Sequence, residues 1–389
     1  MAIAEGVDIP IWLNTACSPE LPLREVVARA GGIGYNGLEV MAFLEEGGDR
    51  AGALDFAASH ISAKRLTVDS ANDILSMFSD AGMGLTLGVY HNMLTADMDQ
   101  ASANLDQLVS VINAAHLLGG RRNGVSVGTF AGMDATLDYD GNLEKFGAVF
   151  GPVLSYAAAL GIDVSFENCQ MEGWMATGQR DSLCNLAGTY QLRSMMVDAV
   201  GGAENLLWIP DPSHGLAQGD GVQGVLRALL METPSRIRAL HIKDTDNNNP
   251  EALHVRAMRG GFAPPASQRA HEWDVYGGRP TLIGFGGGGD MDWTEYLRGG
   301  ATLLARGDGS YKPVIVENED VWSKQTGNPA ATWQANHAAH LNLAPLCYPL
   351  TDQGYQFNHT QRQVLQTPSV SEGMLLKTHA SVVRAYAGK

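Results

Sequence analysis

The sequence predicts an α/β protein in which eight parallel strands, each followed by a helix, close into a (β/α)8 TIM barrel. Short apolar runs typical of buried strands alternate with longer segments of helical periodicity, and this alternation indicates a parallel sheet. Four of the runs lead directly into an acidic residue or a histidine, namely Glu167, Asp211, His241 and Glu317. Side chains at successive strand ends converge only if the strands form a barrel, whose carboxyl face gathers them.

The length of the chain fits a single barrel with additions. It has 389 residues, and barrels of this kind take about 200 to more than 400 residues as one unit. We therefore expect one TIM barrel over residues 1–345. Residues 346–389 have weak periodicity and are expected to form a C-terminal extension that packs on the barrel or on a neighbouring subunit.

The first half of the chain is expected to supply four strands, at residues 9–13, 37–41, 84–90 and 123–127. A helix over residues 23–30 should end at Gly31, because glycine commonly occupies the C-terminal cap of a helix. A longer helix over residues 97–118 has apolar residues at helical spacing and should end at Gly119.

The second half is expected to supply the other four strands, at residues 162–166, 206–210, 237–240 and 314–316. Helices are predicted between and after them, at residues 143–160, 182–200, 222–231 and 333–343. Gly161 and Gly201 follow the first two of these helices, as the C-terminal glycine rule predicts.

One connection is much longer than the others. About 70 residues separate His241 from the eighth strand, which is far more than a compact loop and helix need. The segment at about 246–289 is polar and rich in Gly and Pro. It is expected to be an insertion on the catalytic face, where loops determine which substrate is accepted.

The charge of the chain excludes two classes of partner. Acidic residues number 42 against 26 Lys and Arg, so the formal net charge is −16. Nucleic acids and anionic membranes bind proteins through clustered basic residues, and the sequence contains no such cluster. We therefore expect neither a nucleic-acid partner nor a membrane partner.

The cysteines and the first residues point to a reducing compartment. The four cysteines lack the close pairing of a zinc ribbon or redox dithiol, and they are too few for a disulfide scaffold; they are Cys17, Cys169, Cys184 and Cys347. The first residues do not resemble a secretory signal, and no apolar run is long enough to span a bilayer. A cytoplasmic location is the expectation.

The four strand-end residues form a mostly oxygen ligand set that suits one divalent cation. Each has an ordinary alternative when taken alone. Glu167 could form a salt bridge at a strand end, Asp211 could form a turn before Pro212, and His241 could be a structural histidine. Glu317 lies in a run of charged residues typical of a solvated loop. Their joint occurrence after four consecutive strands favours a metal centre.

Several short motifs carry a specific resemblance. They are Gly34-Tyr35-Asn36-Gly37-Leu38-Glu39, Phe166-Glu167-Asn168, Asp211-Pro212-Ser213-His214, His241-Ile242-Lys243-Asp244, Gly289-Asp290-Met291-Asp292-Trp293 and Glu317-Asn318-Glu319. In this order they resemble the motifs of the xylose isomerase-like TIM barrels, the sugar isomerase/epimerase family; the motif at 289–293 resembles the segment that precedes the last strand, and the others resemble strand motifs. The resemblance covers residues 8–345, approximately.

The resemblance implies a metal-dependent reaction on a carbohydrate. Residues that match Glu167, Asp211, His241 and Glu317 in the ketose 3-epimerases of the family bind one divalent metal ion, and Mn²⁺ is expected first, with Mg²⁺, Co²⁺ and Zn²⁺ as alternatives. Glu167 and Glu317 are also expected to be the catalytic acid/base pair. They would abstract a proton next to a carbonyl and return it, through a metal-bound enediolate.

Other residues are candidates for binding the sugar. His214 could contact the substrate or brace the carboxylate of Asp211, and Lys243 could hold the developing oxyanion or be a solvated rim charge. His91 follows the third strand and could bind a hydroxyl group or cap the next loop. Trp12 and Trp174 could stack on a sugar face, although most tryptophans are core residues. A homo-oligomer is expected, with a further partner subunit as an alternative.

Three competing functions stay open at this point. The first is a metal-dependent C-glycoside deglycosidase, a lyase that enolises a 3-oxo-glycoside and expels an aromatic group. The insertion would then complete a pocket for that group or bind a partner subunit. The second is an apurinic endonuclease, against which the net charge and the absence of a basic groove argue. The third is a non-catalytic barrel that only binds sugars or a protein partner.

Overall fold

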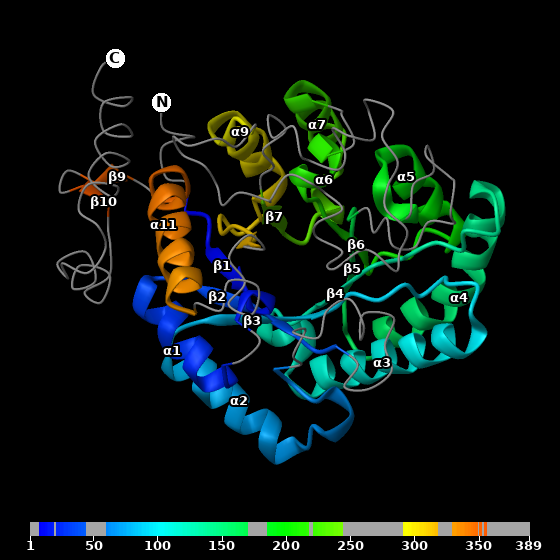
Figure 1. The fold of residues 1–389 in the computed structure, drawn as a ribbon, viewed down its shortest axis with the longest axis horizontal. Helices are drawn as coiled ribbons and strands as arrows, with labels where there is room; N and C mark the ends of the chain where they lie inside the picture. The colour runs from blue at the N-terminus through cyan, green and yellow to red at the C-terminus, as the bar shows by residue number, and fades with distance from the viewer. Residues whose placement is uncertain are drawn as a thin grey trace.

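The computed structural model describes residues 8–18, 21–43, 60–169, 185–217, 221–243, 291–317, 329–348, 350–351 and 354–355. Eight short parallel strands form its centre (Figure 1). They are β1 Ile11–Asn14, β2 Gly37–Met41, β3 Gly84–Val89, β4 Val127–Thr129, β5 Val164–Glu167, β6 Leu206–Ile209, β7 Leu240–Ile242 and β8 Val314–Val316. Neighbouring strands are hydrogen-bonded in the order β6-β5-β4-β3-β2-β1-β8-β7, so the predicted fold class is confirmed.

The seam between β6 and β7 closes the barrel with few contacts. Trp208 and Ile237 form an isolated parallel bridge, and the backbone N–H of Arg238 donates to the carbonyl of Trp208 at 2.9 Å. Further along, the N–H of His241 donates to the carbonyl of Pro210 at 2.9 Å. Single hydrogen bonds therefore join β6 to β7, whereas the other neighbouring strands are joined by continuous ladders.

Helices lie around the outside of the strands (Figure 1). They are α1 Leu23–Ile33, α2 Val68–Asp80, α3 Met98–Leu117, α4 Tyr139–Ala159, α5 Tyr190–Ala199, α6 Pro212–Ala217, α7 Gly221–Leu230, α9 Trp293–Leu304 and α11 Pro329–Cys347. Short 3-10 helices occur at Thr15–Cys17, Ala63–Arg65, Gly120–Asn123, Leu186–Gly188 and Pro234–Arg236, and β9 Leu350–Thr351 pairs antiparallel with β10 Gly354–Tyr355. Leu13, Leu38 and Leu87 on the strands are fully buried in the core that faces these helices.

The prediction for the end of the first helix was wrong by three residues. Helix α1 continues through Gly31 and Gly32 to Ile33 and is capped by Gly34, which has φ 117° and donates its N–H to the carbonyl of Ala30 at 3.0 Å. A left-handed backbone favours glycine because other residues carry a Cβ that clashes. Gly31 does not adopt that conformation, so the helix does not end there.

Four strands begin later than predicted, β1 and β5 by two residues, β7 by three and β4 by four. Residues 120–123 form a 3-10 helix and Gly124 has φ 70°, so β4 begins only at Val127. In the seventh strand, Ile237 faces β6 through the isolated bridge, and the ladder with β8 starts at Leu240. His241 therefore lies inside β7 rather than after it.

Three α-helices were not predicted, namely α2, α6 and α9, and one predicted helix is partly outside the described residues. Helix α2 buries Ala71 and Phe78, and Ile74, Leu75 and Met77 pack partly buried against the same core. Helix α9 follows the long connection after β7. The N-terminal part of the helix predicted at 182–200 lies outside the described residues up to 184, and α5 begins at Tyr190. The insertion at 246–289 and most of the extension at 346–389 also lie outside them, so the division of the chain into these parts stays a prediction.

The barrel interior has an apolar floor made of Trp12, Ile209, Ala239 and Ile315. Three of these residues precede Asp211, His241 and Glu317 by two positions, and side chains two positions apart on a strand face the same way. The floor therefore lies one layer closer to the amino ends of the strands than those polar residues. A Cβ on Gly37 or on Gly84 would lie 2.4 Å from the Trp12 ring, so the neighbouring strands carry glycine where the indole needs room.

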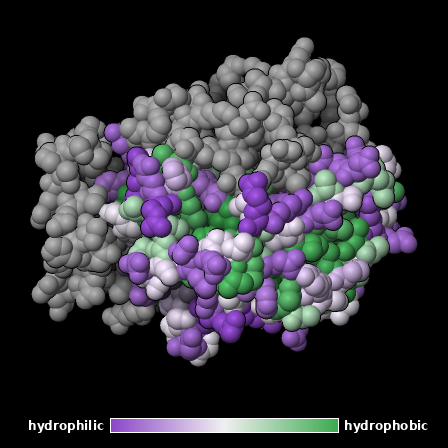
Figure 2. All heavy atoms as spheres, turned by 90° about the horizontal axis from the view of Figure 1, so that it is seen from below, coloured by the Kyte–Doolittle hydropathy of each residue, from purple (hydrophilic) through white to green (hydrophobic). Residues whose placement is uncertain are grey.

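The outer surface of the described residues is mixed. Hydrophilic side chains surround smaller apolar areas on the face shown in Figure 2. Large exposed apolar residues are spread over several helices, as Val68 on α2, Met98 on α3 and Met195 on α5 show. Scattered residues of this kind are normal on a protein surface and indicate no partner.

The His340 side chain on α11 makes stability depend on pH. It is fully buried, Nε2 donates to the carbonyl of Gly34 at 3.1 Å, and its ring lies edge-on to Tyr35 at 5.1 Å. Burial lowers the pKa of His340 to about 4. A histidine whose pKa is lower in the folded state destabilises the fold as the pH falls from the unfolded pKa, about 6.5, toward the folded one, because only the unfolded state then binds the proton.

We expect the free energy of unfolding to fall by about 2 kcal/mol through this residue between pH 7 and pH 5. Denaturant unfolding at the two pH values measures it in the wild type and in His340→Gln, whose amide can still donate to Gly34. The variant should show the smaller pH dependence, and His116→Gln on the exposed side of α3 is the matched control. Equal pH dependence in the wild type and His340→Gln would contradict the prediction.

Candidate metal centre

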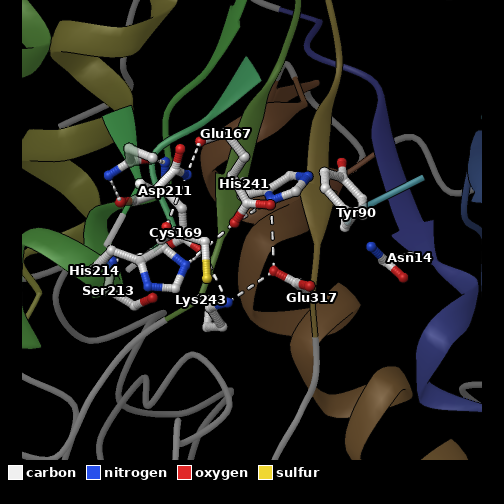
Figure 3. A network of polar contacts seen from close by, with 12 residues as sticks. Asn14, Tyr90, Glu167, Cys169, Asp211, Ser213, His214, His241, Lys243 and Glu317 are labelled. Atoms are coloured by element: carbon white, nitrogen blue, oxygen red, sulfur yellow. Dashed lines mark hydrogen bonds and ion pairs between the residues drawn. The ribbon is translucent and has the colours of Figure 1, made fainter. Parts of the chain in front are cut away.

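The four predicted ligand residues lie together at the carboxyl ends of the strands (Figure 3). Glu167 ends β5, Asp211 follows β6, His241 is the middle residue of β7 and Glu317 follows β8. One ligand atom from each lies within 4.8 Å of the others. Glu167, Asp211 and His241 are buried, and the Glu317 side chain is 11% exposed. The structure thus brings together the set that the sequence predicted.

His241 is held with one ring nitrogen toward the cluster. Its Nε2 lies 3.2 Å from Oε2 of Glu39, whereas its Nδ1 lies 3.4 Å from Oε1 of Glu167 and 3.5 Å from Oε2 of Glu317. Among the described residues, Nδ1 is buried and has no hydrogen-bond partner. A carboxylate that fixes one imidazole nitrogen and leaves the other for a cation is the usual arrangement around a metal-binding histidine.

Asp211 is fixed in the same way, with one oxygen left for the cluster. Oδ1 accepts from the N–H of Ser213 at the start of α6, at 2.8 Å. The Asn168 side chain binds the Asp211 backbone twice, at 2.9 Å to the carbonyl and 2.7 Å from the N–H. Oδ2 is buried without a well-directed hydrogen bond from any described residue, although Lys243 Nζ lies 3.0 Å away. A buried, under-satisfied carboxylate oxygen fits a cation ligand.

Glu39 on β2 supports His241 on β7, and sequence reasoning missed this role. Its carboxylate accepts from Asn14 Nδ2 at 2.9 Å and from the Tyr90 hydroxyl at 2.5 Å. A Cβ on Gly128 would lie 2.7 Å from Glu39 Oε1, so β4 has a glycine where this pair needs space. The available signal was a carboxylate in the middle of an otherwise apolar strand, since Glu39 is fully buried in β2.

Two basic side chains balance the carboxylates. Lys243 Nζ lies 2.9 Å from Oε2 of Glu317, and His214 Nε2 lies 3.2 Å from both Oε1 of Glu167 and Oδ2 of Asp211. Lys243 is only 3% exposed, so the alternative of a solvated rim charge was wrong. His214 contacts two of the predicted ligands, as the bracing alternative predicted.

The charges in the cluster shift the pKa values in opposite directions. Burial opposes ionisation of Glu167, but His241, His214 and Lys243 outweigh it and lower the pKa of Glu167 to about 2. Burial also opposes ionisation of Asp211, whose pKa is nevertheless held well below its usual value, chiefly by Lys243 and His214. Both carboxylates are therefore anionic at neutral pH, as cation ligands must be.

The pKa values of the two imidazoles are raised instead. Burial alone lowers the pKa of His241, but Glu167 and Glu39 raise it well above its usual value. For His214, Cys169 and Asp211 likewise outweigh burial and raise the pKa. A cation bound at the cluster would replace the proton on His241, because only a neutral imidazole is a metal ligand.

The other predicted substrate residues are placed differently. His91 follows β3, is buried, and lies edge-on to Phe43 at 5.7 Å. Trp12 packs in the apolar floor, one layer below the ligand cluster. Trp174 lies outside the described residues. The roles of His214, Lys243, His91 and Trp12 in binding a substrate stay predictions.

A parallel barrel with three carboxylates and an imidazole converging at the carboxyl ends of its strands is typical of enzymes that bind a divalent cation. A family profile described as xylose isomerase-like TIM barrel matches residues 27–310. The chain belongs to this family. No curated protein matches it in sequence.

Several solved structures share the fold. D-psicose 3-epimerase with D-tagatose from Clostridium cellulolyticum H10 has a TM-score of 0.52 and 16% identity, covering 85% of this chain and 96% of the other. L-ribulose 3-epimerase has a TM-score of 0.55 and 14% identity, with 93% and 99% covered. The IOLI protein with a binding zinc atom has a TM-score of 0.56 and 13% identity, with 87% and 99% covered.

None of the described helices is both long and apolar enough to cross a bilayer.

Proposed function

We propose that the protein is a divalent-metal-dependent sugar isomerase/epimerase that moves a proton on a carbon next to a carbonyl group. The observation that carries this proposal is the placement of Glu167 and Glu317. They extend from β5 and β8, with β6 and β7 between these strands along one side of the barrel, and both approach His241 Nδ1 within 3.5 Å. The similarity to solved ketose 3-epimerases supports it.

In this proposal Glu167, Asp211, His241 and Glu317 hold one divalent ion. The described residues fit it, because Asp211 Oδ2 and His241 Nδ1 are buried and under-satisfied. When bound, the ion would stabilise negative charge on the oxygens of a sugar next to the carbon that loses a proton. A set rich in oxygen with a single nitrogen suits Mn²⁺ or Mg²⁺, and Co²⁺ and Zn²⁺ are the alternatives.

The two glutamates would transfer the proton. Their carboxylates extend from β5 and from the end of β8, and in this proposal a sugar bound at the ion would present one face to Glu167 and the other to Glu317. Removal of a proton by one carboxylate and its replacement by the other inverts the carbon, which is epimerisation. Return of the proton to the neighbouring carbon by a single carboxylate gives isomerisation. The paired placement favours epimerisation of a ketose.

Lys243 and Glu39 would have positioning roles. Lys243 Nζ contacts both Asp211 and Glu317, so it would hold these two carboxylates in orientation, and its charge lowers the pKa of Asp211. Glu39 would hold the His241 ring through Nε2 and so present Nδ1 to the ion. Tyr90, whose pKa is raised by burial and by Glu39, stays a hydroxyl donor to that carboxylate.

Metal removal and replacement test the proposal. After treatment with a chelator, the protein should lose proton exchange between a ketose and heavy water, and Mn²⁺ should restore it. An ion present at about 100 times its dissociation constant stabilises the fold by about 2.7 kcal/mol, so Mn²⁺ should also raise the melting temperature.

Two variants sharpen this test. Asp211→Asn should lose the stabilisation by Mn²⁺, whereas Asp163→Asn, which breaks an ion pair with Arg121 at the other end of β5, should keep it. The substrate panel would contain ketoses, inososes and 3-oxo-glycosides. If Mn²⁺ changed neither stability nor exchange with any of them, the proposed function would be wrong, and turnover of 3-oxo-glycosides alone would favour the lyase.

A further inference from the structure

A second group of ligand-type side chains adjoins the candidate metal centre. Glu167, Cys169 and His214 are all buried, and one ligand atom from each lies within 4.8 Å of the others. Cys169 lies among the side chains of the cluster in Figure 3. The proposed proton transfer uses Glu167 but gives the thiol no role.

The backbone holds this group in place. The Asn185 side chain donates to the carbonyls of Glu167 at 2.9 Å and Cys169 at 2.8 Å, so the turn after β5 is fixed by one amide. His214 is positioned from the other side, because α6 begins directly after Asp211, and Nε2 lies 3.2 Å from Oε1 of Glu167. The three ligands thus come from two segments that are each anchored by hydrogen bonds.

The ligand chemistry of this group differs from that of the first. The first has three carboxylates and one imidazole, which suit hard cations, whereas a thiolate with an imidazole selects softer ions. Zn²⁺ commonly binds Cys, His and Glu in a tetrahedral site, and three protein ligands leave one position for water or a substrate oxygen. Two adjacent groups of ligand-type side chains, one suited to hard cations and one to softer cations, therefore share the Glu167 carboxylate.

We propose that Glu167, Cys169 and His214 form a second cation site that takes Zn²⁺ or Co²⁺ in preference to Mn²⁺. On binding, the Cys169 thiol gives its proton to solvent and the sulfur forms a bond to the ion, with no change of oxidation state. The ion also engages Glu167. As a consequence that rests on the proposed function, Zn²⁺ at this site withdraws Glu167 from proton transfer and inhibits turnover supported by Mn²⁺.

Cobalt binding tests the site without any enzymatic assay. Co²⁺ added to the full-length wild-type protein should produce a thiolate-to-cobalt absorption band in the near ultraviolet, and Cys169→Ser should abolish it. Glu317→Gln should keep the band, because Glu317 belongs only to the first site. Cys17→Ser removes another buried thiol, Cys184→Ser removes the one outside the described residues, and both variants should also keep it.

Zinc affinity gives a second measurement. Equilibrium dialysis should show two Zn²⁺ per wild-type chain, and Cys169→Ser should weaken the second by at least about 100-fold, since even outer partners of a metal site are worth about 10–100-fold. Absence of the band in the wild type, or its persistence in Cys169→Ser, would overturn the proposal. A band in a protein without sugar turnover would leave the site standing and refute only the proposed function.

Discussion

Glu317→Gln is expected to reduce kcat by about 10²–10⁴-fold, the usual contribution of general acid–base catalysis, without unfolding the protein. The side chain lies at the rim of the cluster, with 11% of it exposed, so an amide of the same shape fits there. It cannot accept a proton from carbon as a carboxylate does. Circular dichroism and the melting temperature would confirm that the fold is retained.

The loss of catalysis in this variant must be distinguished from a loss of bound metal. The amide keeps one oxygen toward the ion, so Mn²⁺ affinity should fall less than kcat, and assays at saturating Mn²⁺ isolate the remaining loss. Glu144→Gln, an exposed residue on α4, is the control and should have wild-type kcat. Full activity of Glu317→Gln at saturating Mn²⁺ would show that Glu317 is not part of the acid/base pair.

Heavy-water exchange distinguishes the two glutamates further. If each removes the proton from one epimer, Glu317→Gln should lose exchange with one epimer of the substrate and keep it with the other. Glu167→Gln should show the opposite preference. If one variant lost exchange with both epimers and the other kept exchange with both, a single carboxylate would be moving the proton, and isomerisation would replace epimerisation as the proposed reaction.

Trp12→Ala is expected to lower the free energy of unfolding by about 3–5 kcal/mol, as is usual when a large aromatic core residue is removed. The indole fills the floor of the barrel with Ile209, Ala239 and Ile315, and Gly37 and Gly84 leave no side chain to replace it. Denaturant unfolding measures the effect. Trp12→Phe keeps an aromatic ring and should cost less.

The result also decides between two roles for Trp12. A floor residue affects stability and leaves KM for the sugar nearly unchanged in the molecules that remain folded. A residue that stacks on the sugar raises KM and leaves stability nearly unchanged. If Trp12→Ala unfolded at the wild-type denaturant concentration while KM rose, its assignment to the floor would be incorrect.

The fold and the four ligands could be predicted because they depend on local patterns. An apolar run shows where a strand lies, and the residue that follows it is placed at the carboxyl end of the barrel whatever the other strands do. Glu167, Asp211 and Glu317 follow this rule. His241 was assigned to the same face even though β7 begins three residues later than predicted, because the ladder with β8 starts at Leu240.

The supporting contacts could not be predicted because they join distant segments. Glu39 and His241 are 202 residues apart in sequence, and only the closure of the barrel brings them together. Lys243 could equally have pointed to solvent, since its burial depends on Asp211 and Glu317 lying on either side of it. Helix α2 was missed although Ala71, Ile74 and Phe78 recur at helical spacing and pack against the core.

The sparse closure between β6 and β7 has a consequence for the whole molecule. Asp211 follows β6 and His241 lies in β7, so the two side chains are on opposite sides of that seam, where the strands are joined only at Trp208–Ile237 and by single hydrogen bonds. A ligand that binds both side chains would therefore also hold β6 and β7 together where the barrel has its weakest strand pairing. Filling the centre would therefore raise the resistance of the barrel to opening between these two strands.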